Sequence, residues 1–211
     1  MAIINRGVGR ALENDAAKEY GSVLTPELAD SLWREQMQRG GIVSFRIASG
    51  SMLPTLAPGD NVRVKKFPPL SDPGLGDIVL FNMGGTWVVH RVVGKECGDG
   101  RLSYWQKGDA EYRATLTPAT AVAGRVVAIE HGYRHIDLNT PLQKAINRSI
   151  GAILYVMDQI LRFGGDVGNG KGENADQVSA WRIKASGCFR KTRVVVVGIG
   201  ARLMRLGARR E

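Results

Sequence analysis

The chain has 211 residues, of which 44% are hydrophobic and 23% charged; this is typical of one folded domain with extensions and excludes a disordered or collagen-like protein. Its 29 Lys and Arg against 20 Asp and Glu give a formal net charge of +9, which favours anionic partners such as phospholipid head groups or nucleic acid. The two cysteines, Cys97 and Cys188, fit neither a disulfide framework nor a metal motif. We assign them no role and expect no cofactor or metal.

The first 15 residues contain Arg6, Arg10 and Glu13 and have no apolar run as long as a secretory signal requires. The longest apolar stretches, residues 149–157 and 194–201, are well short of the roughly 18 residues that a membrane-spanning helix needs. We therefore expect neither a signal peptide nor a transmembrane helix. The expected location is cytoplasmic, either free or peripheral at a membrane.

Residues 1–41 are predicted to form a helical extension, in which Thr25 caps a helix that begins at Pro26 and ends before Gly40. From residue 42 to residue 138 the pattern changes to short β-rich runs separated by Gly, Pro, Asp and Asn. Such a series predicts a mainly β domain, built as an antiparallel sheet or barrel. The predicted strands are residues 42–48, 61–66, 77–82, 86–94, 101–107, 122–130 and 133–138.

An amphipathic helix is predicted over residues 139–163, because apolar residues recur there at three- and four-residue spacing. Its apolar face is expected to pack on the sheet or on a partner, and binding to a membrane surface is the alternative. Residues 164–180 are predicted to be a Gly-rich linker, since Gly172 stands where a phosphate-binding loop needs Ser or Thr. Residues 181–211 form a basic segment with a single acidic residue, Glu211.

The segment richest in functional signals is residues 48–56, ASGSMLPTL, which Gly59 and Asp60 follow closely. A turn of small residues at the end of a strand can expose a hydroxyl and aim neighbouring backbone amides at one point, as a nucleophile and its oxyanion hole require. The segment resembles the nucleophile box of the signal peptidase I family, which shares its fold with LexA-type self-cleaving repressors. The resemblance implies that Ser51 is the nucleophile.

Further segments carry the same resemblance, which spans about residues 43–130. In WVVHRVVG, residues 87–94, His90 precedes Arg91, as in the archaeal, endoplasmic-reticulum and spore-type branch, where histidine takes the place of the usual lysine base. A neutral imidazole suits this task, because its unperturbed pKa is about 6.5. The resemblance therefore implies a mainly β signal peptidase/LexA-like peptidase core with flanking N- and C-terminal α-helices, and we reject Lys95 as the base. The other matching segments are residues 76–81, 104–110 and 124–127.

By the same resemblance Asp109, within YWQKGDA, is the candidate carboxylate that orients His90. A turn Asp that satisfies backbone amides is the alternative. Relatives in this branch generally carry a second Asp where this chain has Thr115, and Glu111 is the substitute to consider. Ser49 is expected to add its hydroxyl to the oxyanion hole beside the Ser51 amide.

The sequence thus predicts a serine endopeptidase, related to signal peptidase I, that cleaves a peptide or preprotein with a Ser-His dyad or a Ser-His-Asp triad. One alternative is a LexA-like self-cleaving regulator that binds DNA through its basic tail, although we consider nucleic acid an unlikely partner. Another is a catalytically silent module that binds a peptide or a membrane. An anionic membrane surface, contacted by the basic C-terminal segment, is the expected second partner besides the substrate.

Overall fold

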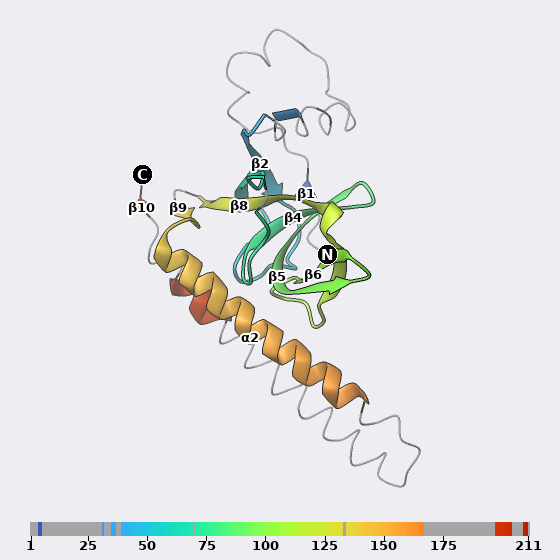
Figure 1. Ribbon diagram of the computed structural model, residues 1–211. Coiled ribbons are helices and arrows are strands. Elements are labelled where there is room, and N and C mark those ends of the chain that lie inside the picture. The colour runs from blue at the N-terminus through green and yellow to red at the C-terminus, as the bar shows by residue number, and fades with distance from the viewer. Residues whose placement is uncertain are drawn as a thin grey trace.

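The protein folds around one antiparallel sheet with a long helix against it (Figure 1). The computed structural model describes residues 4–5, 31, 35–36, 39–69, 71–132, 134–166, 197–203 and 209–210. Strands follow one another across the sheet in the order β1-β2-β3-β8-β4-β5-β6-β7, and β9 joins β8 and β10. The elements are β1 (Ile4–Asn5), β2 (Ile42–Ile47), β3 (Asn61–Lys65), β4 (Ile78–Met83), β5 (Thr86–Gly98), β6 (Arg101–Lys107), β7 (Thr115–Pro118), the short 3-10 helix η2 (Ala119–Ala121), β8 (Val122–His131), β9 (Arg134–Asp137), α2 (Pro141–Asp166) and β10 (Arg209–Arg210).

The prediction of a mainly β fold is confirmed, and the seven predicted strands correspond to β2 to β6, β8 and β9. Strand β5 continues beyond the predicted end at residue 94, because it forms a long hairpin with β6 in which Gly98 lies opposite Arg101. The sequence analysis missed β7, a four-residue strand that ends in Pro118 and gives too short a pattern to detect. It also missed β1 and β10, which have two residues each.

The predicted extensions are described only in part. Ser31, Glu35 and Gln36 have helical conformation, and most of the predicted helix that begins at Pro26 lies outside the described residues. Helix α2 begins at Pro141, as predicted, and continues to Asp166, so it includes the first residues of the predicted linker. The rest of the linker and most of the basic segment lie outside the described residues, apart from a helix over residues 197–203 and β10.

The main core lies between β2, β3, β4, β5 and β8, where alternate side chains point inward. The burial pattern of β2 alternates at every residue, which is typical of a strand with one face on the core. Strand β4 is buried on both faces over its first four residues, since it lies between β5 and β8 near the centre of the sheet. The fully buried side chains of this core include Phe45, Met52, Leu56, Val62, Val64, Leu80 and Val89.

Helix α2 packs on β5 through Ile150 and Leu154, which form a second apolar cluster with Val93, Ala114 and Val197. The helix over residues 197–203 lies beside α2 (Figure 1), and a Cβ on its Gly200 would come within 2.5 Å of Ile150. Other apolar residues of α2 remain exposed, namely Leu142, Ile153, Val156 and Ile160. Within the described residues, no helix has the length and apolar character needed to cross a bilayer.

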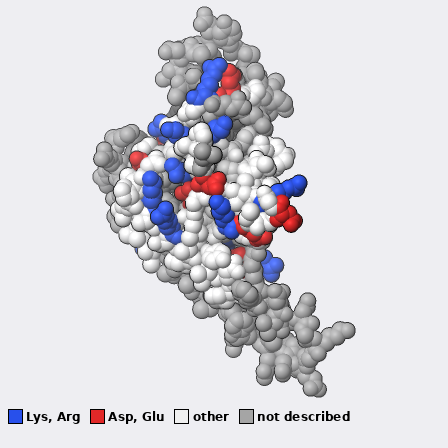
Figure 2. Space-filling view, viewed as in Figure 1, with Lys and Arg blue, Asp and Glu red and all other residues white. Residues whose placement is uncertain are grey.

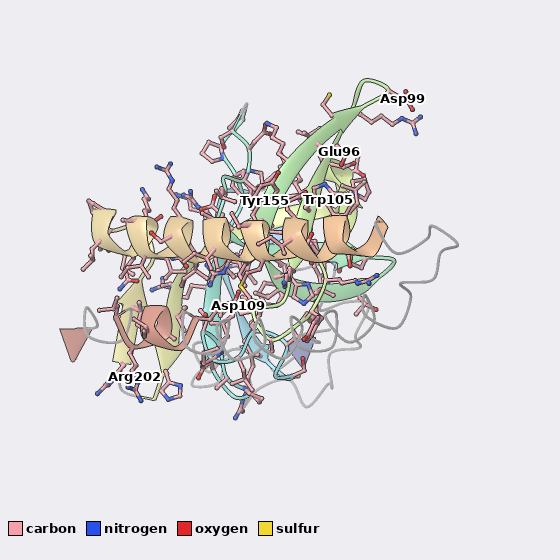
Figure 3. The ribbon with its side chains drawn as sticks, turned by 90° about the horizontal axis from the view of Figure 1, so that it is seen from below. Glu96, Asp99, Trp105, Asp109, Tyr155 and Arg202 are labelled. Atoms are coloured by element: carbon pink, nitrogen blue, oxygen red, sulfur yellow. The ribbon has the colours of Figure 1, made fainter. Side chains whose placement is uncertain are left out.

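The hairpin of β5 and β6 extends beyond the sheet, with Asp99 at its tip (Figure 3). Trp105 of β6 donates a hydrogen bond to Glu96 of β5 (2.8 Å), and Tyr155 of α2 lies beside Trp105. On the face seen in Figure 2, acidic and basic side chains of the described residues are interspersed. The described residues of that face therefore form no continuous basic surface.

Candidate active site

Ser51 lies in the turn that follows β2. Hydrogen bonds from the Leu53 amide to the Gly50 carbonyl (3.1 Å) and from the Leu56 amide to the Met52 carbonyl (2.9 Å) close this turn. Met52 and Leu56 are fully buried and anchor it in the main core. Ser51 is itself 8% exposed, so it lies at the edge of the core.

His90 lies at the centre of β5, and its side chain reaches the turn of Ser51. The Ser51 Oγ is 3.2 Å from the His90 Nε2, which is within hydrogen-bonding distance. His90 as a whole is 4% exposed. The structure therefore brings together the two residues that the sequence predicted as nucleophile and base, although they are separated by 39 positions.

Gln106 of β6 is the residue that the sequence analysis missed. Its Oε1 bonds the Nδ1 of His90, and its Nε2 donates to the Oγ1 of Thr117 (3.3 Å) on β7. Because an amide oxygen only accepts, this arrangement favours a proton on Nδ1 and leaves the lone pair of Nε2 directed at Ser51. Gln106 therefore selects the tautomer that a general base needs.

Asp109, the predicted carboxylate partner of the base, lies against Arg91. Its Oδ1 and Oδ2 accept hydrogen bonds from Nε and Nη2 of Arg91 (2.8 and 2.7 Å), and Oδ2 also accepts one from the Oγ1 of Thr55 (2.5 Å). The Nδ1 of His90 is bonded by Gln106 instead. A fully buried guanidinium thus binds this carboxylate in a bidentate pair, so Gln106 rather than Asp109 contacts the Nδ1 of His90. The part of Asp109 in orienting His90 and stabilising the imidazolium stays a prediction.

Among the described residues, Glu111 is the acidic group that forms an ion pair with the base. Its Oε1 is 3.5 Å from the His90 Nε2, and its Oε2 accepts a hydrogen bond from the Gly108 amide (3.1 Å). Burial alone would raise the pKa of Glu111, but attraction to His90 and the bond from Gly108 hold the pKa below its usual value. A carboxylate beside Nε2 can stabilise an imidazolium once it forms.

The protonation state of His90 follows from its burial. Burial lowers the pKa of His90, because desolvation disfavours the charged imidazolium. The charge of Glu111 and the hydrogen bond with Gln106 oppose this effect without reversing it. His90 is therefore neutral near pH 7 and able to accept a proton.

The remaining predicted residues lie as follows. Ser49 is half-buried in the turn before Ser51, and its part in an oxyanion hole stays a prediction. Lys95, rejected as a base, is exposed and bonds Asp72 (2.8 Å). Thr115, where the resemblance places a second Asp, is exposed at the start of β7, opposite Gln106 in the strand register.

No protein-family model, curated protein or solved structure matches this chain.

Proposed function

We propose that the protein is a serine endopeptidase of the signal peptidase type. The observation that carries the proposal is the chain of contacts Ser51-His90-Gln106, in which all three side chains are buried. A serine hydroxyl is a weak nucleophile unless a positioned base removes its proton, and a neutral imidazole within 3.2 Å meets that requirement. The resemblance of residues 48–56 and 87–94 to signal peptidase motifs supports the same assignment.

In the proposed reaction the Ser51 Oγ attacks the carbonyl carbon of a peptide bond while its proton moves to the His90 Nε2. The tetrahedral intermediate collapses as the imidazolium returns this proton to the leaving amine, which breaks the C–N bond and leaves an ester on Ser51. Water then attacks the ester while His90 accepts its proton. The imidazolium returns this proton to the Ser51 Oγ as the bond between Oγ and the acyl carbon breaks, and the acid is released. Gln106 holds the imidazole, and Glu111 supplies the negative charge that a neutral amide lacks.

The oxyanion is proposed to be held by the Ser51 amide and the Ser49 hydroxyl. Their contribution should be large, because losing one such donor costs about 100- to 1,000-fold in rate in a characterised serine protease. The proposed substrate is a peptide or preprotein with small residues before the cleaved bond. That preference follows from the resemblance to the family.

Labelling with a serine-directed acylating probe tests the proposal. We expect the unmodified protein to be acylated at Ser51, and Ser51→Ala and His90→Ala to lose the label. Ser71→Ala is the control, because Ser71 is exposed and its hydroxyl bonds the Pro68 carbonyl. Absence of labelling under conditions that acylate a signal peptidase would favour a catalytically silent peptide-binding module.

We also propose that the protein binds peripherally to anionic membranes. Support comes from the exposed residues Leu142, Val156 and Ile160 of α2 and from the net charge of +9. Co-sedimentation with vesicles that contain phosphatidylserine tests this part, and we expect binding that weakens as salt is added. Equal recovery with neutral and anionic vesicles would contradict it.

A further inference from the structure

We infer that Asn147 of helix α2 helps to position the turn that carries Ser51, which we call the nucleophile turn. It does so through hydrogen bonds that pass from Asn147 to Arg91 and from Arg91 to Asp109. The expected effect on the rate of acylation rests on the proposed function. The hydrogen-bonded link from Asn147 to the nucleophile turn does not, and it has a test of its own.

Arg91 is the centre of the link. It follows His90 on β5, is 0% exposed, and donates from all three guanidinium nitrogens. Nε and Nη2 bind the carboxylate of Asp109, and Nη1 donates to the carbonyl of Gly76 (2.9 Å) and to the Oδ1 of Asn147 (2.6 Å). A buried guanidinium needs such partners, because each donor left unpaired costs free energy.

Asp109 carries the link to the nucleophile. Its Oδ2 accepts from the Thr55 hydroxyl, four residues after Ser51 in the same turn. The neighbouring Ala110 amide donates to the Ser51 carbonyl (2.7 Å). On the other side of Asp109, a Cβ on Gly108 would come within 2.6 Å of the same carbonyl. The backbone of Ser51 thus rests on the segment that the Arg91-Asp109 pair holds in place.

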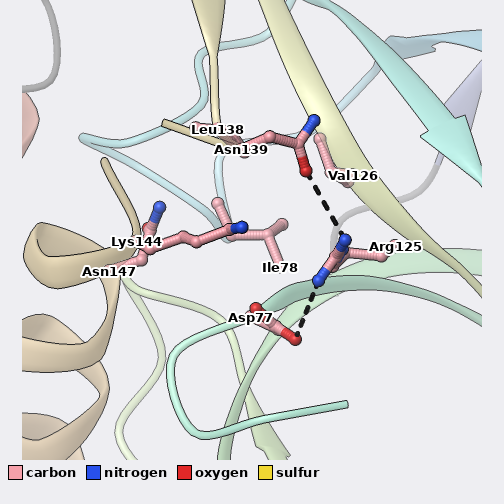
Figure 4. Close-up of a pocket in the computed structure, with 8 residues that line it drawn as sticks. All are labelled: Asp77, Ile78, Arg125, Val126, Leu138, Asn139, Lys144 and Asn147. Atoms are coloured by element: carbon pink, nitrogen blue, oxygen red, sulfur yellow. Dashed lines mark hydrogen bonds and ion pairs between the residues drawn. The ribbon is translucent and has the colours of Figure 1, made fainter. Parts of the chain in front are cut away.

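Helix α2 reaches this pair because two glycines allow a close approach. Gly76 has a φ of +88°, and a Cβ there would lie 2.2 Å from the Asn147 carbonyl oxygen. A Cβ on Gly151 would lie 2.6 Å from the Cα of Gly76. Asn147 is therefore buried between α2 and the strands, and it lines a small pocket together with Asp77, Arg125 and Lys144 (Figure 4).

The arrangement explains why an amide of α2 should matter for chemistry on β5. His90 and Arg91 are consecutive residues, so the strand that carries the base also carries the guanidinium that fixes the nucleophile turn. Loss of the Asn147 oxygen leaves a donor of Arg91 unpaired in a buried site. Small displacements are costly here, because a misplacement of about 1 Å can slow a reaction by about 100-fold.

The test compares Asn147→Leu with Gln143→Leu. Gln143 is also buried on α2, one helical turn earlier, but Arg91 donates to Asn147 rather than to it. Two quantities are measured in the full chain: the hydrogen-exchange rate of the Ala110 amide by NMR, and the rate of Ser51 acylation by the serine-directed probe. Unfolding midpoints report any general loosening of the helix.

We expect Asn147→Leu to exchange the Ala110 amide about tenfold faster and to be acylated about tenfold more slowly, which corresponds to about 1.4 kcal/mol in each case. Gln143→Leu should change neither rate by this amount, even if its unfolding midpoint falls as far as that of Asn147→Leu. If Asn147→Leu does not fold, Asn147→Ala serves the same purpose, because it only deletes the amide.

Unchanged exchange in the Asn147 variant, or an equal effect of Gln143→Leu, would overturn the inference. If the unmodified protein is not acylated at all, the proposed function fails, and the exchange of Ala110 still decides whether Asn147 holds the nucleophile turn.

Discussion

The Nδ1 of His90 is bonded to the side-chain oxygen of Gln106, a neutral amide in the place where serine peptidases of the triad type have a carboxylate. The two residues lie on adjacent antiparallel strands, two positions apart in the register that pairs Val92 with Gln106. Gln106 is fixed in turn by Thr117. The orientation and tautomer of the base therefore depend on β6 and β7 together.

Gln106→Ala should slow acylation of Ser51 by about ten- to 100-fold, because the imidazole loses the partner that holds its tautomer. Gln106→Glu should keep the imidazole oriented and raise the pKa of His90, because a carboxylate stabilises the imidazolium. As the pH is lowered, this variant should therefore lose activity at a higher pH than the unmodified protein. Acylation rates over a range of pH measure both effects. Thr117→Val should have a smaller effect, and an unchanged rate in Gln106→Ala would exclude the orienting role.

As the pH is lowered, the rate of Ser51 acylation should fall only below the usual histidine pKa of about 6.5. Burial lowers the pKa of His90, so the neutral base persists below about pH 6.5. The unfolded chain binds this proton first, so the stability that neutral His90 confers is lost as the pH falls from about 6.5 through the lower pKa of the folded state. NMR titration of the imidazole checks the pKa independently of activity, and a value above 6.5 would contradict this expectation.

Glu111→Gln should move this fall in rate to still lower pH. The carboxylate lies 3.5 Å from the His90 Nε2 and stabilises the imidazolium, so its removal lowers the pKa of His90 further. Glu96→Gln is the matched control, since Glu96 bonds Trp105 on the outer part of the β5-β6 hairpin. The same shift in both variants would indicate a general charge effect rather than the contact with His90.

Asp109→Asn should lower stability and also slow acylation of Ser51, because Asp109 joins Arg91 to the turn that carries Ser51. The variant leaves Arg91 buried without its counter-charge, and breaking such a pair costs about 3–5 kcal/mol. Denaturant unfolding measures the loss, and Asp72→Asn, which breaks the exposed pair with Lys95, should change stability little. Equal stability of Asp109→Asn and the unmodified protein would contradict a structural role for the buried pair with Arg91.

Gly151→Ala should destabilise the packing of α2 by about 1–3 kcal/mol, because the added methyl group would meet the backbone of Gly76. Gly98→Ala is the control, since a Cβ there meets no atom within 4 Å. Thermal unfolding compares the two variants. Equal midpoints would show that α2 does not lie as close to residues 75–77 as described.

Much of the sheet could be predicted from local pattern. Strands β2, β3, β5, β6 and β8 begin at the predicted residues, because alternation in half-buried strands and the Gly, Pro and Asp turns between them are local properties. The contact between Ser51 and His90 was also anticipated, through the resemblance of their segments to one family. In contrast, β7 and the two-residue strands are too short to give a pattern of their own.

The sequence alone determined which residues are chemically suited to the site: a serine in a turn of small residues, a histidine in an apolar strand, and the acidic residues Asp109 and Glu111. Only the tertiary structure decided their partners. Arg91 can only donate hydrogen bonds, whereas Gln106 can both donate and accept them. Strand register and the close approach of α2 place Asp109 against Arg91 and His90 against Gln106. Hydrogen bonds act over about 3 Å. Such pairings therefore depend on how strands and helices pack, which residue type and spacing do not specify.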